Sequence, residues 1–233
     1  MTRLDKLTKK LQHKVPMARL SAQTLPLAPS IKLALIEETY PQSELSPKDI
    51  EFLMDEPPYW AFCWASGQVL AKYLIDNPRE VKNKTVVDFG SGSGVVGIAA
   101  KQAGAAQVFA VDSDPTALLA TQVNSRLNQV EVKTYHNLTQ ILFKKEDSIL
   151  LIADVFYDSQ NIPMLSNFLD DFNDVIIADS RVAPQELTGV EVTDQYESST
   201  VPDLGESIAF NSCLLYTSPS PRDLSTSRMP SSA

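Results

Sequence analysis

Hydrophobic and polar residues follow two different periods along this chain, and the changes of period predict its elements. Short apolar or β-branched runs are typical of buried strands, and they lie near residues 85–87, 107–111, 131–135, 149–153 and 174–178. Segments with an apolar face at helical spacing lie before or between them, at 66–76, 95–103 and 115–128. Because strands and helices alternate, we expect a doubly wound α/β fold with a mostly parallel sheet. Such a sheet binds its ligand at the carboxyl ends of the strands.

The segment before this alternation predicts an extension and a cap over the domain. Residues 1–20 are locally basic, and Leu4, Leu7 and Leu11 share one helical face. This pattern favours a surface helix, with a mitochondrial presequence as the alternative. Residues 21–58 mix apolar and acidic residues with several prolines, which is typical of a covering segment. We therefore divide the chain into an extension and cap at 1–58, an α/β domain at 59–212 and a tail at 213–233.

Composition narrows the classes of partner. The formal net charge of −9 argues against a nucleic-acid partner bound by bulk electrostatics. No apolar run approaches the ~20 residues needed to cross a bilayer, so no membrane partner is expected. The two cysteines, Cys63 and Cys213, lie far apart and outside any metal-binding spacing. We expect a monomer in a reducing compartment, the cytoplasm, with the mitochondrial matrix as the alternative.

Residues 86–94, Val-Val-Asp-Phe-Gly-Ser-Gly-Ser-Gly, carry the strongest chemical signal in the sequence. A β-branched run ends on Asp88 and then turns through Gly90, Gly92 and Gly94. Alternate glycines allow a tight turn and leave room for a ligand against the backbone. The next predicted strand ends on Asp112, the position at which an acid normally holds a ribose diol. The alternative is a glycine-rich turn without a ligand.

A dinucleotide site is the nearest rival for this loop, since residues 92–97 also fit G-x-G-x-x-G. Acidic residues gather near the loop, while Lys101 is the one basic residue between Asp88 and Asn124. A pyrophosphate would be repelled by these carboxylates, because it needs positive partners. S-adenosyl-L-methionine carries a sulfonium cation and no phosphate. The charges therefore favour S-adenosyl-L-methionine over NAD.

A second group of polar residues follows the apolar run 149–153. Asp154 and Tyr157 would reach the same sheet edge as the glycine loop, with a loop acid and a rim aromatic as the respective alternatives. A later strand leads to Asp179 and Arg181, which could either serve the site or simply pair with each other. The aromatic segment 57–64 precedes the helix predicted at 66–76, and its tryptophans either cover the ligand or belong to the core.

Together these motifs resemble the class I, seven-strand methyltransferases. The pattern D-x-G-x-G-x-G with a distal Asp matches their motifs I and II, and Asp154 to Tyr157 matches the D-x-x-Y tetrad of one lysine methyltransferase branch. Residues 57–68 resemble the P-P-[YF]-W-A-F-x-W-P-G-G-Q stretch of the electron transfer flavoprotein β-subunit lysine methyltransferases and their bacterial homologues. Residues 200–204, Thr-Val-Pro-Asp-Leu, match a further motif of that family.

The resemblance implies a Rossmann-like fold with a truncated last strand and a role for each matching position. Asp112 would hold the ribose of S-adenosyl-L-methionine, Asn137 would lie near the adenine, and Trp64 would pack on the cofactor. Asp154 and Tyr157 would be the catalytic residues facing a substrate lysine, with Asp154 also near the cofactor. The methionine part would be lined by the glycine-loop residues Asp88, Gly90, Ser91, Gly92 and Gly94.

The sequence departs from the family motif at two places. Ala65-Ser66 stands where Pro-Gly is usual, and residues 178–180 read Ala-Asp-Ser where Gly-Asp-Pro is usual. The implied function is methylation of a protein lysine, in the β-subunit of electron transfer flavoprotein. The alternatives are a ribosomal protein L11-type lysine methyltransferase, a small-molecule N-methyltransferase and an inactive cofactor-binding subunit.

The C-terminal segment 213–233 resembles translated sequencing adapter. Its end is rich in Ser, Pro and Arg without apolar periodicity, so we expect a non-native, disordered tail. The last native strand would begin near Ser207, with Ile208 and Phe210, and 214–216 would extend it by accident. Residues 217–233 would then pack against nothing.

Overall fold

The computed structural model describes residues 2–40, 45–46, 57–144, 147–203 and 205–219. The chain begins with helix α1 (Arg3–Lys14), whose first turn is closed by a capping box between Thr2 and Asp5. Leu7 and Leu11 are buried on its inner face against α5. The predicted surface helix is thus present. A two-stranded antiparallel sheet of β1 (Leu20–Thr24) and β2 (Lys32–Ile36) follows, and β2 also contacts α5.

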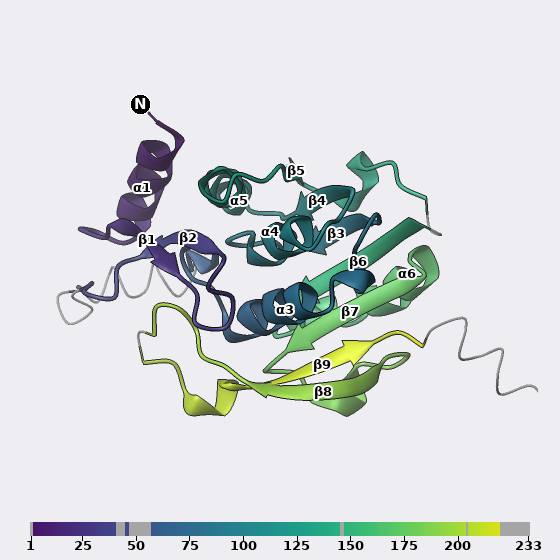
Figure 1. Cartoon of the computed structure of the whole chain (residues 1–233). Helices are drawn as coiled ribbons and strands as arrows, with labels where there is room; N and C mark the ends of the chain where they lie inside the picture. Colours follow the sequence, from purple (N-terminus) through teal and green to yellow (C-terminus); the bar gives the residue numbers. More distant parts are fainter. Residues whose placement is uncertain (1, 41–44, 47–56, 145–146, 204, 220–233) are drawn as a thin grey trace, which may run out of the picture.

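A seven-stranded sheet forms the centre of the molecule (Figure 1). Its strands lie in the order β5-β4-β3-β6-β7-β9-β8. The first five in this order are parallel, while β9 is antiparallel to both of its neighbours. The strand bounds are β3 (Thr85–Phe89), β4 (Gln107–Val111), β5 (Lys133–Tyr135), β6 (Ser148–Ala153), β7 (Asp174–Asp179), β8 (Glu191–Glu197) and β9 (Ser212–Thr217).

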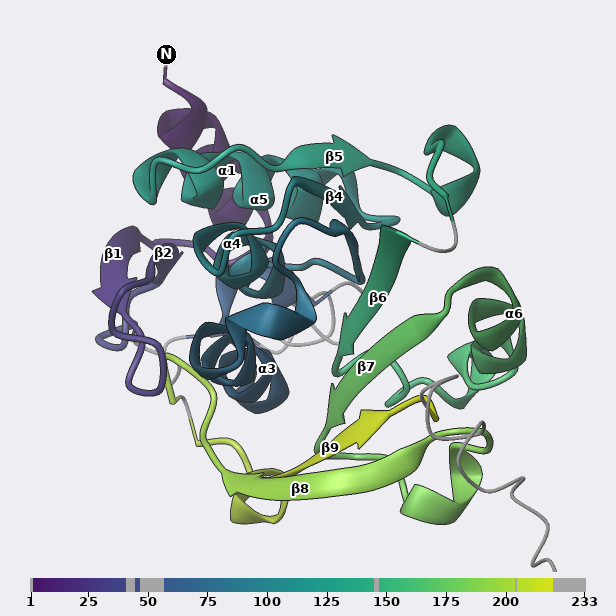
Figure 2. The ribbon, with the colours of Figure 1, turned by 45° about the vertical axis from the view of Figure 1, so that its right-hand side comes forward.

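Helices cover both faces of this sheet because its strands are apolar on both sides. Side chains alternate along each strand, so that Val86 packs with α3 (Ala65–Asp76) and α4 (Val95–Gln102), while Val87 packs with α6 (Met164–Asp171). Helix α5 (Pro115–Leu127) contacts α4 and strands β4 and β5. In Figure 1, α3, α4 and α5 lie in front of the sheet. The turned view in Figure 2 places α6 beside β7, on the side away from α3 and α4.

Short 3-10 helices complete the described elements: η2 (Tyr59–Ala61), η3 (Pro78–Glu80), η4 (Leu138–Gln140), η6 (Ser159–Asn161), η7 (Pro184–Glu186) and η8 (Ile208–Phe210). The predicted fold class is confirmed, and the five strands and three helices predicted between residues 66 and 178 agree with the observed ones to within about two residues. Within the ranges given above, no helix is long and apolar enough to cross a membrane.

The C-terminal strand differs from the prediction. Ile208–Phe210 forms η8, and the strand begins only at Ser212. Residues 212–217 form β9, which pairs with β7 on one side and β8 on the other, and Leu215 and Tyr216 are buried. Beyond it, the Ser218 N–H donates to the Val175 carbonyl at 2.9 Å.

The predicted boundary at residue 212 therefore cuts an interior strand, and the expectation that packing ends before 217 is wrong for Thr217 and Ser218. The physical reason is that residues 213–216 supply apolar side chains to both faces of the sheet, whatever their origin. Residues 220–233, the rest of the predicted tail, lie outside the described residues.

Candidate functional site

The glycine loop between β3 and α4 turns tightly around the end of β4. The backbone N–H groups of Gly90 and Ser91 donate to the Val111 carbonyl at 2.9 and 3.1 Å. Gly90 has a φ of +72°, and a Cβ there would lie 2.4 Å from Val155 Cγ2. Glycine is therefore required here both by backbone conformation and by the close approach of the loop after β6.

Asp88 connects the strand before this loop to the helix after it. Its side chain is buried at 2% exposure, and its Oδ2 accepts from the Gly97 N–H in α4 at 2.9 Å. Burial raises the pKa of Asp88 to about 7, while the Gly97 N–H opposes the shift. Asp88 thus fixes the first turn of α4 against β3.

Asp112 stands at the end of β4, where the sequence predicts a ribose-binding acid. Its Oδ2 accepts from the Gly92 N–H and its Oδ1 from the Asp114 N–H, both at 2.9 Å. Burial raises the pKa of Asp112, and these two N–H donors counteract the rise. Each carboxylate oxygen has a second lone pair, so Asp112 can accept further hydrogen bonds from a ligand.

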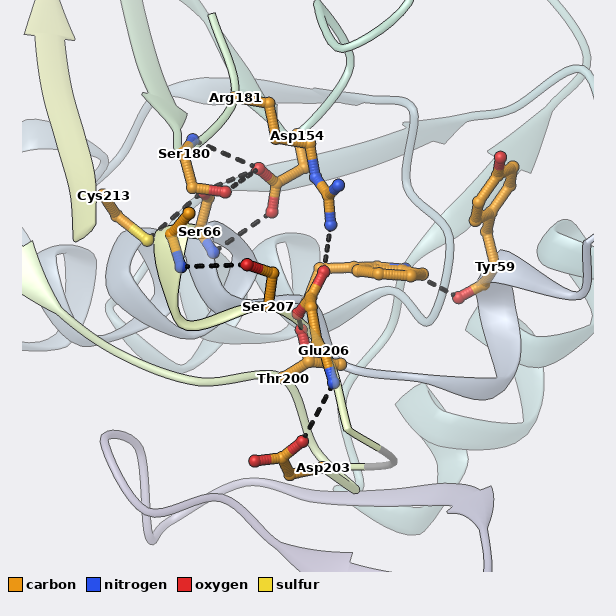
Figure 3. A network of polar contacts seen from close by, with 12 residues as sticks. Tyr59, Ser66, Asp154, Ser180, Arg181, Thr200, Asp203, Glu206, Ser207 and Cys213 are labelled. Atoms are coloured by element: carbon orange, nitrogen blue, oxygen red, sulfur yellow. Dashed lines mark hydrogen bonds and ion pairs between the residues drawn. The ribbon is translucent and has the colours of Figure 1, made fainter. Parts of the chain in front are cut away.

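Asp154, after β6, joins three parts of the domain (Figure 3). Its Oδ2 accepts from the Ser66 N–H at 3.1 Å, and its Oδ1 accepts from the hydroxyls of Ser66 at 2.8 Å and Ser180 at 3.1 Å. Its backbone is left-handed, with φ +48°. Burial raises the pKa of Asp154 to about 6, reinforced by the charge of Asp179.

An aromatic rim stands beside Asp154, formed by Tyr59, Trp64 and Tyr157. The ring centroids of Tyr59 lie 5.6 Å from Tyr157 and 5.7 Å from Trp64, and the Trp64 indole donates to the Tyr59 carbonyl at 3.0 Å. Tyr157 is about half exposed, at 48%. Burial of its inner half raises the pKa of the Tyr157 phenol, reinforced by Tyr59, so the hydroxyl stays protonated at neutral pH.

Arg181 closes the rim on one side. Its guanidinium lies over Trp64, with 5.4 Å between the guanidinium carbon and the ring centroid, and over Phe210 at 4.0 Å. It pairs with Glu206, which also accepts from the Thr200 hydroxyl (Figure 3). The suggested pairing of Asp179 with Arg181 takes a different form, since Asp179 accepts from the backbone N–H of Arg181 at 2.8 Å.

These groups meet in one cavity of about 600 Å³ at the carboxyl ends of the strands, the edge that the sequence predicts. Seven of the predicted site residues line it: Trp64, Gly90, Gly92, Asp112, Asn137, Asp154 and Tyr157.

The other predicted contacts, Asp88, Ser91 and Gly94, are not among the described residues that line the cavity. Asp88 is bonded to α4, the Ser91 hydroxyl lies 3.3 Å from the Thr121 hydroxyl, and Gly94 is the N-cap of α4. Direct cofactor contact by these three stays a prediction, and the structure shows that each also supports the loop itself.

Sequence reasoning overlooked several residues of the site. Ser66 and Ser180 bind Asp154, and Tyr59 and Leu138 line the cavity beside predicted residues. Ser66 and Ser180 carried one usable signal, since both depart from the family motif. Tyr59 carried a weaker one, as a member of the aromatic segment.

The comparisons with known proteins agree with this architecture. Residues 69–182 match the family model described as ribosomal protein L11 methyltransferase. The chain is 35% identical over 146 residues to the human electron transfer flavoprotein β-subunit lysine methyltransferase, covering 61% of this chain and 54% of that protein. It is 43% identical over 79 residues to a ribosomal protein L11 methyltransferase of Acinetobacter baumannii, covering 33% and 26%.

Among solved structures, a putative RNA methyltransferase from Pyrococcus horikoshii has a TM-score of 0.51 at 17% identity, covering 65% of this chain and 81% of that one. This likeness concerns the fold. The strand order and this likeness give the chain the class I, seven-strand methyltransferase fold. Within that class, the chain is similar to the electron transfer flavoprotein β-subunit lysine methyltransferases, at 33–42% identity. It spans about half the length of the curated relatives it matches.

Proposed function

We propose that this protein is an S-adenosyl-L-methionine-dependent N-methyltransferase whose acceptor is a lysine in the β-subunit of electron transfer flavoprotein. One observation carries the proposal: the glycine loop, Asp112 and the Asp154–Tyr157 segment face a single cavity. The sequence similarity to proteins named for that activity supports the choice of acceptor.

The residues of the cavity fit this cofactor. Gly90 and Gly92 bring bare backbone to the cavity wall, and Asp112 offers free lone pairs to a ribose diol. Three carboxylates line the cavity, Asp112, Asp114 and Asp154, against the one lysine or arginine among its described lining residues, Arg181. This balance suits a sulfonium cation and opposes a pyrophosphate.

The acceptor would arrive between Asp154 and the aromatic rim. Bound S-adenosyl-L-methionine would supply an electrophilic methyl group. Lysine has an unperturbed pKa near ~10.4, so its ammonium must lose a proton before it can attack. Asp154 would attract and orient the incoming ammonium, and Tyr157 would hydrogen-bond the amine or a water molecule that takes the proton. Because the residues supply no covalent step, their contribution is positioning.

A second acceptor, ribosomal protein L11, is favoured by the family model that matches residues 69–182. The extent of the similarity speaks against it, because the match to the flavoprotein β-subunit lysine methyltransferase covers 61% of this chain and the match to the L11 methyltransferase covers 33%. The two acceptors therefore form the arms of one experiment. The cytoplasmic location and the monomeric state stay predictions.

The test incubates the protein with methyl-labelled S-adenosyl-L-methionine and either purified electron transfer flavoprotein or purified L11. We expect label on the flavoprotein β-subunit and none on L11. The opposite pattern would move the proposal to L11, and no label with either would contradict both acceptors. Gly92→Arg serves as the control for cofactor binding, because a long side chain would fill the cavity where only backbone lies.

Asp154→Asn separates binding from catalysis. The asparagine oxygen can keep the Ser66 N–H, while its amide faces two hydroxyls that can accept. We expect cofactor affinity within a few-fold and methyl transfer lower by about a hundredfold or more, the scale of losing one acid–base or orienting group. A fully active variant would remove Asp154 from the mechanism.

A further inference from the structure

The Asp154 carboxylate is the meeting point of hydrogen bonds from two distant segments. Ser66, in the first turn of α3, donates from both its N–H and its hydroxyl. Ser180, directly after β7, donates from its hydroxyl at 3.1 Å and from its N–H at 3.4 Å. The two hydroxyls converge on the same oxygen, Oδ1 (Figure 3). Each carboxylate oxygen receives one N–H, which can only donate, so the arrangement fits a carboxylate better than a protonated acid.

The Ser66 hydroxyl belongs to a wider buried network. Ser66 is fully buried, at 0% exposure, and its hydroxyl also lies 3.4 Å from Cys213 Sγ in β9. The network therefore ties α3, β6, β7 and β9 together at the cavity wall.

We propose that Ser66 and Ser180 are positioning residues that keep the Asp154 carboxylate ionised and aimed along the cavity wall, and thereby set the lowest pH at which the site works. The inference rests on the proposed methyltransferase function only for its catalytic consequence. The effect on ionisation concerns the protein alone and can be measured without a substrate.

The other charged groups around Asp154 act in opposite directions on the ionisation of its carboxyl group. Burial and the carboxylate of Asp179 both favour the protonated form. Arg181 favours the ionised form, but its charge is shared with Glu206. Cys63 and Cys213 are held as neutral thiols, since burial raises the pKa of each. The pKa of Asp154 lies at about 6, and the Ser66 hydroxyl is the largest influence that lowers it. The Ser180 hydroxyl reaches the same carboxylate oxygen at 3.1 Å and stabilises the ionised form by the same physical effect.

The expected effect follows from the strength of a hydrogen bond to a charged group. Losing one such donor raises a carboxyl pKa by about one unit. The pKa of Asp154 would then rise to ~7 in Ser66→Ala or Ser180→Ala and to ~8 in the double variant. At pH 7 the ionised fraction would therefore fall with each lost donor, by roughly tenfold once the pKa lies one unit above the pH.

The direct test is an NMR titration of protein labelled with carbon-13 at its aspartate carboxyls, with Asp154→Asn identifying the Asp154 signal. We expect the titration midpoint of Asp154 to move upward by about one unit in each single variant. Ser125→Ala is the matched control, because Ser125 is also buried but its hydroxyl donates to the Gln122 carbonyl. An unchanged midpoint in both serine variants would overturn the proposal. If Ser66→Ala fails to fold, Ser180→Ala alone decides.

The second readout is the ratio of variant to wild-type methyl transfer between pH 6 and pH 9, in which the titration of the lysine acceptor cancels. We expect the double variant to be about tenfold slower at pH 7 and near wild type at pH 9. The single variant Ser180→Thr, which keeps a hydroxyl at this position, should keep the wild-type profile. A loss that is constant with pH would mean that the serines act only on structure. Absence of transfer by the wild-type protein would refute the function, while the NMR shift would still stand.

Discussion

Gly90→Ala is the sharpest test of how the glycine loop meets the loop that carries Asp154. At φ +72°, an alanine would cost about 1–2 kcal/mol of folding free energy in backbone strain. Its Cβ would also lie 2.4 Å from Val155 Cγ2, and relieving such overpacking costs about 1–3 kcal/mol. We therefore expect Gly90→Ala to lower the free energy of unfolding by about 2–5 kcal/mol.

The two contributions can be separated by a double-mutant cycle with Val155→Ala. Removing the valine methyl groups abolishes the clash and leaves the backbone strain, so the double variant should be more stable than additivity predicts, by about 1–3 kcal/mol. Urea unfolding followed by circular dichroism gives each free energy of unfolding, provided that its slope against urea concentration is the same in all variants. Gly104→Ala is the control, since φ is +98° there but the nearest atom, Lys82 Cγ, lies at 3.6 Å. Additivity within about 0.5 kcal/mol for Gly90 and Val155 would refute the reasoning.

Three further predictions concern single residues. Asp112→Ala should weaken S-adenosyl-L-methionine binding by about 1–3 kcal/mol through lost charge-assisted hydrogen bonds, and calorimetry showing equal affinity would contradict its role. Leu215→Ala should lower the free energy of unfolding by about 2–5 kcal/mol, because Leu215 is fully buried in β9, and an unchanged urea midpoint would show that β9 is dispensable. Asp88 has a folded-state pKa of about 7, above its unfolded value of ~3.9. The stability of the wild-type protein should therefore fall, relative to that of Asp88→Asn, as the pH rises from ~4 to ~7. A difference in melting temperature between the two proteins that does not change with pH would contradict this.

Much of the fold and part of the site could be predicted from sequence, because the signals are local. The apolar run at 149–153 corresponds to β6, and the run at 107–111 corresponds to β4. Each is a short buried strand whose composition alone identifies it. The spacing of the glycine loop and Asp112 placed both at one sheet edge, since parallel strands end together.

The prediction for Asp88 shows where local reasoning ends. Its place in the motif made it a candidate ligand contact, which stays a prediction, and the structure adds a role that the motif does not show, a hydrogen bond to the Gly97 N–H in α4. A strand residue points to one face or the other of the sheet, and at Asp88 that face is the one covered by α4. The sequence shows that an acid stands at this position, but the packing of α4 on the sheet determines which group its carboxylate binds.

The sequence by itself determined the parallel α/β order, the glycine turn and the acid at the end of β4, because strand period, backbone freedom and charge are properties of a few neighbouring residues. The tertiary structure alone decided that 212–217 lie inside the sheet and that Ser66 and Ser180 meet at Asp154. Ser66 lies 88 residues from Asp154 and Ser180 lies 26 residues from it. Contacts between residues so far apart in the sequence form only when the sheet brings its strand ends and the start of α3 together. No local sequence pattern can therefore predict them.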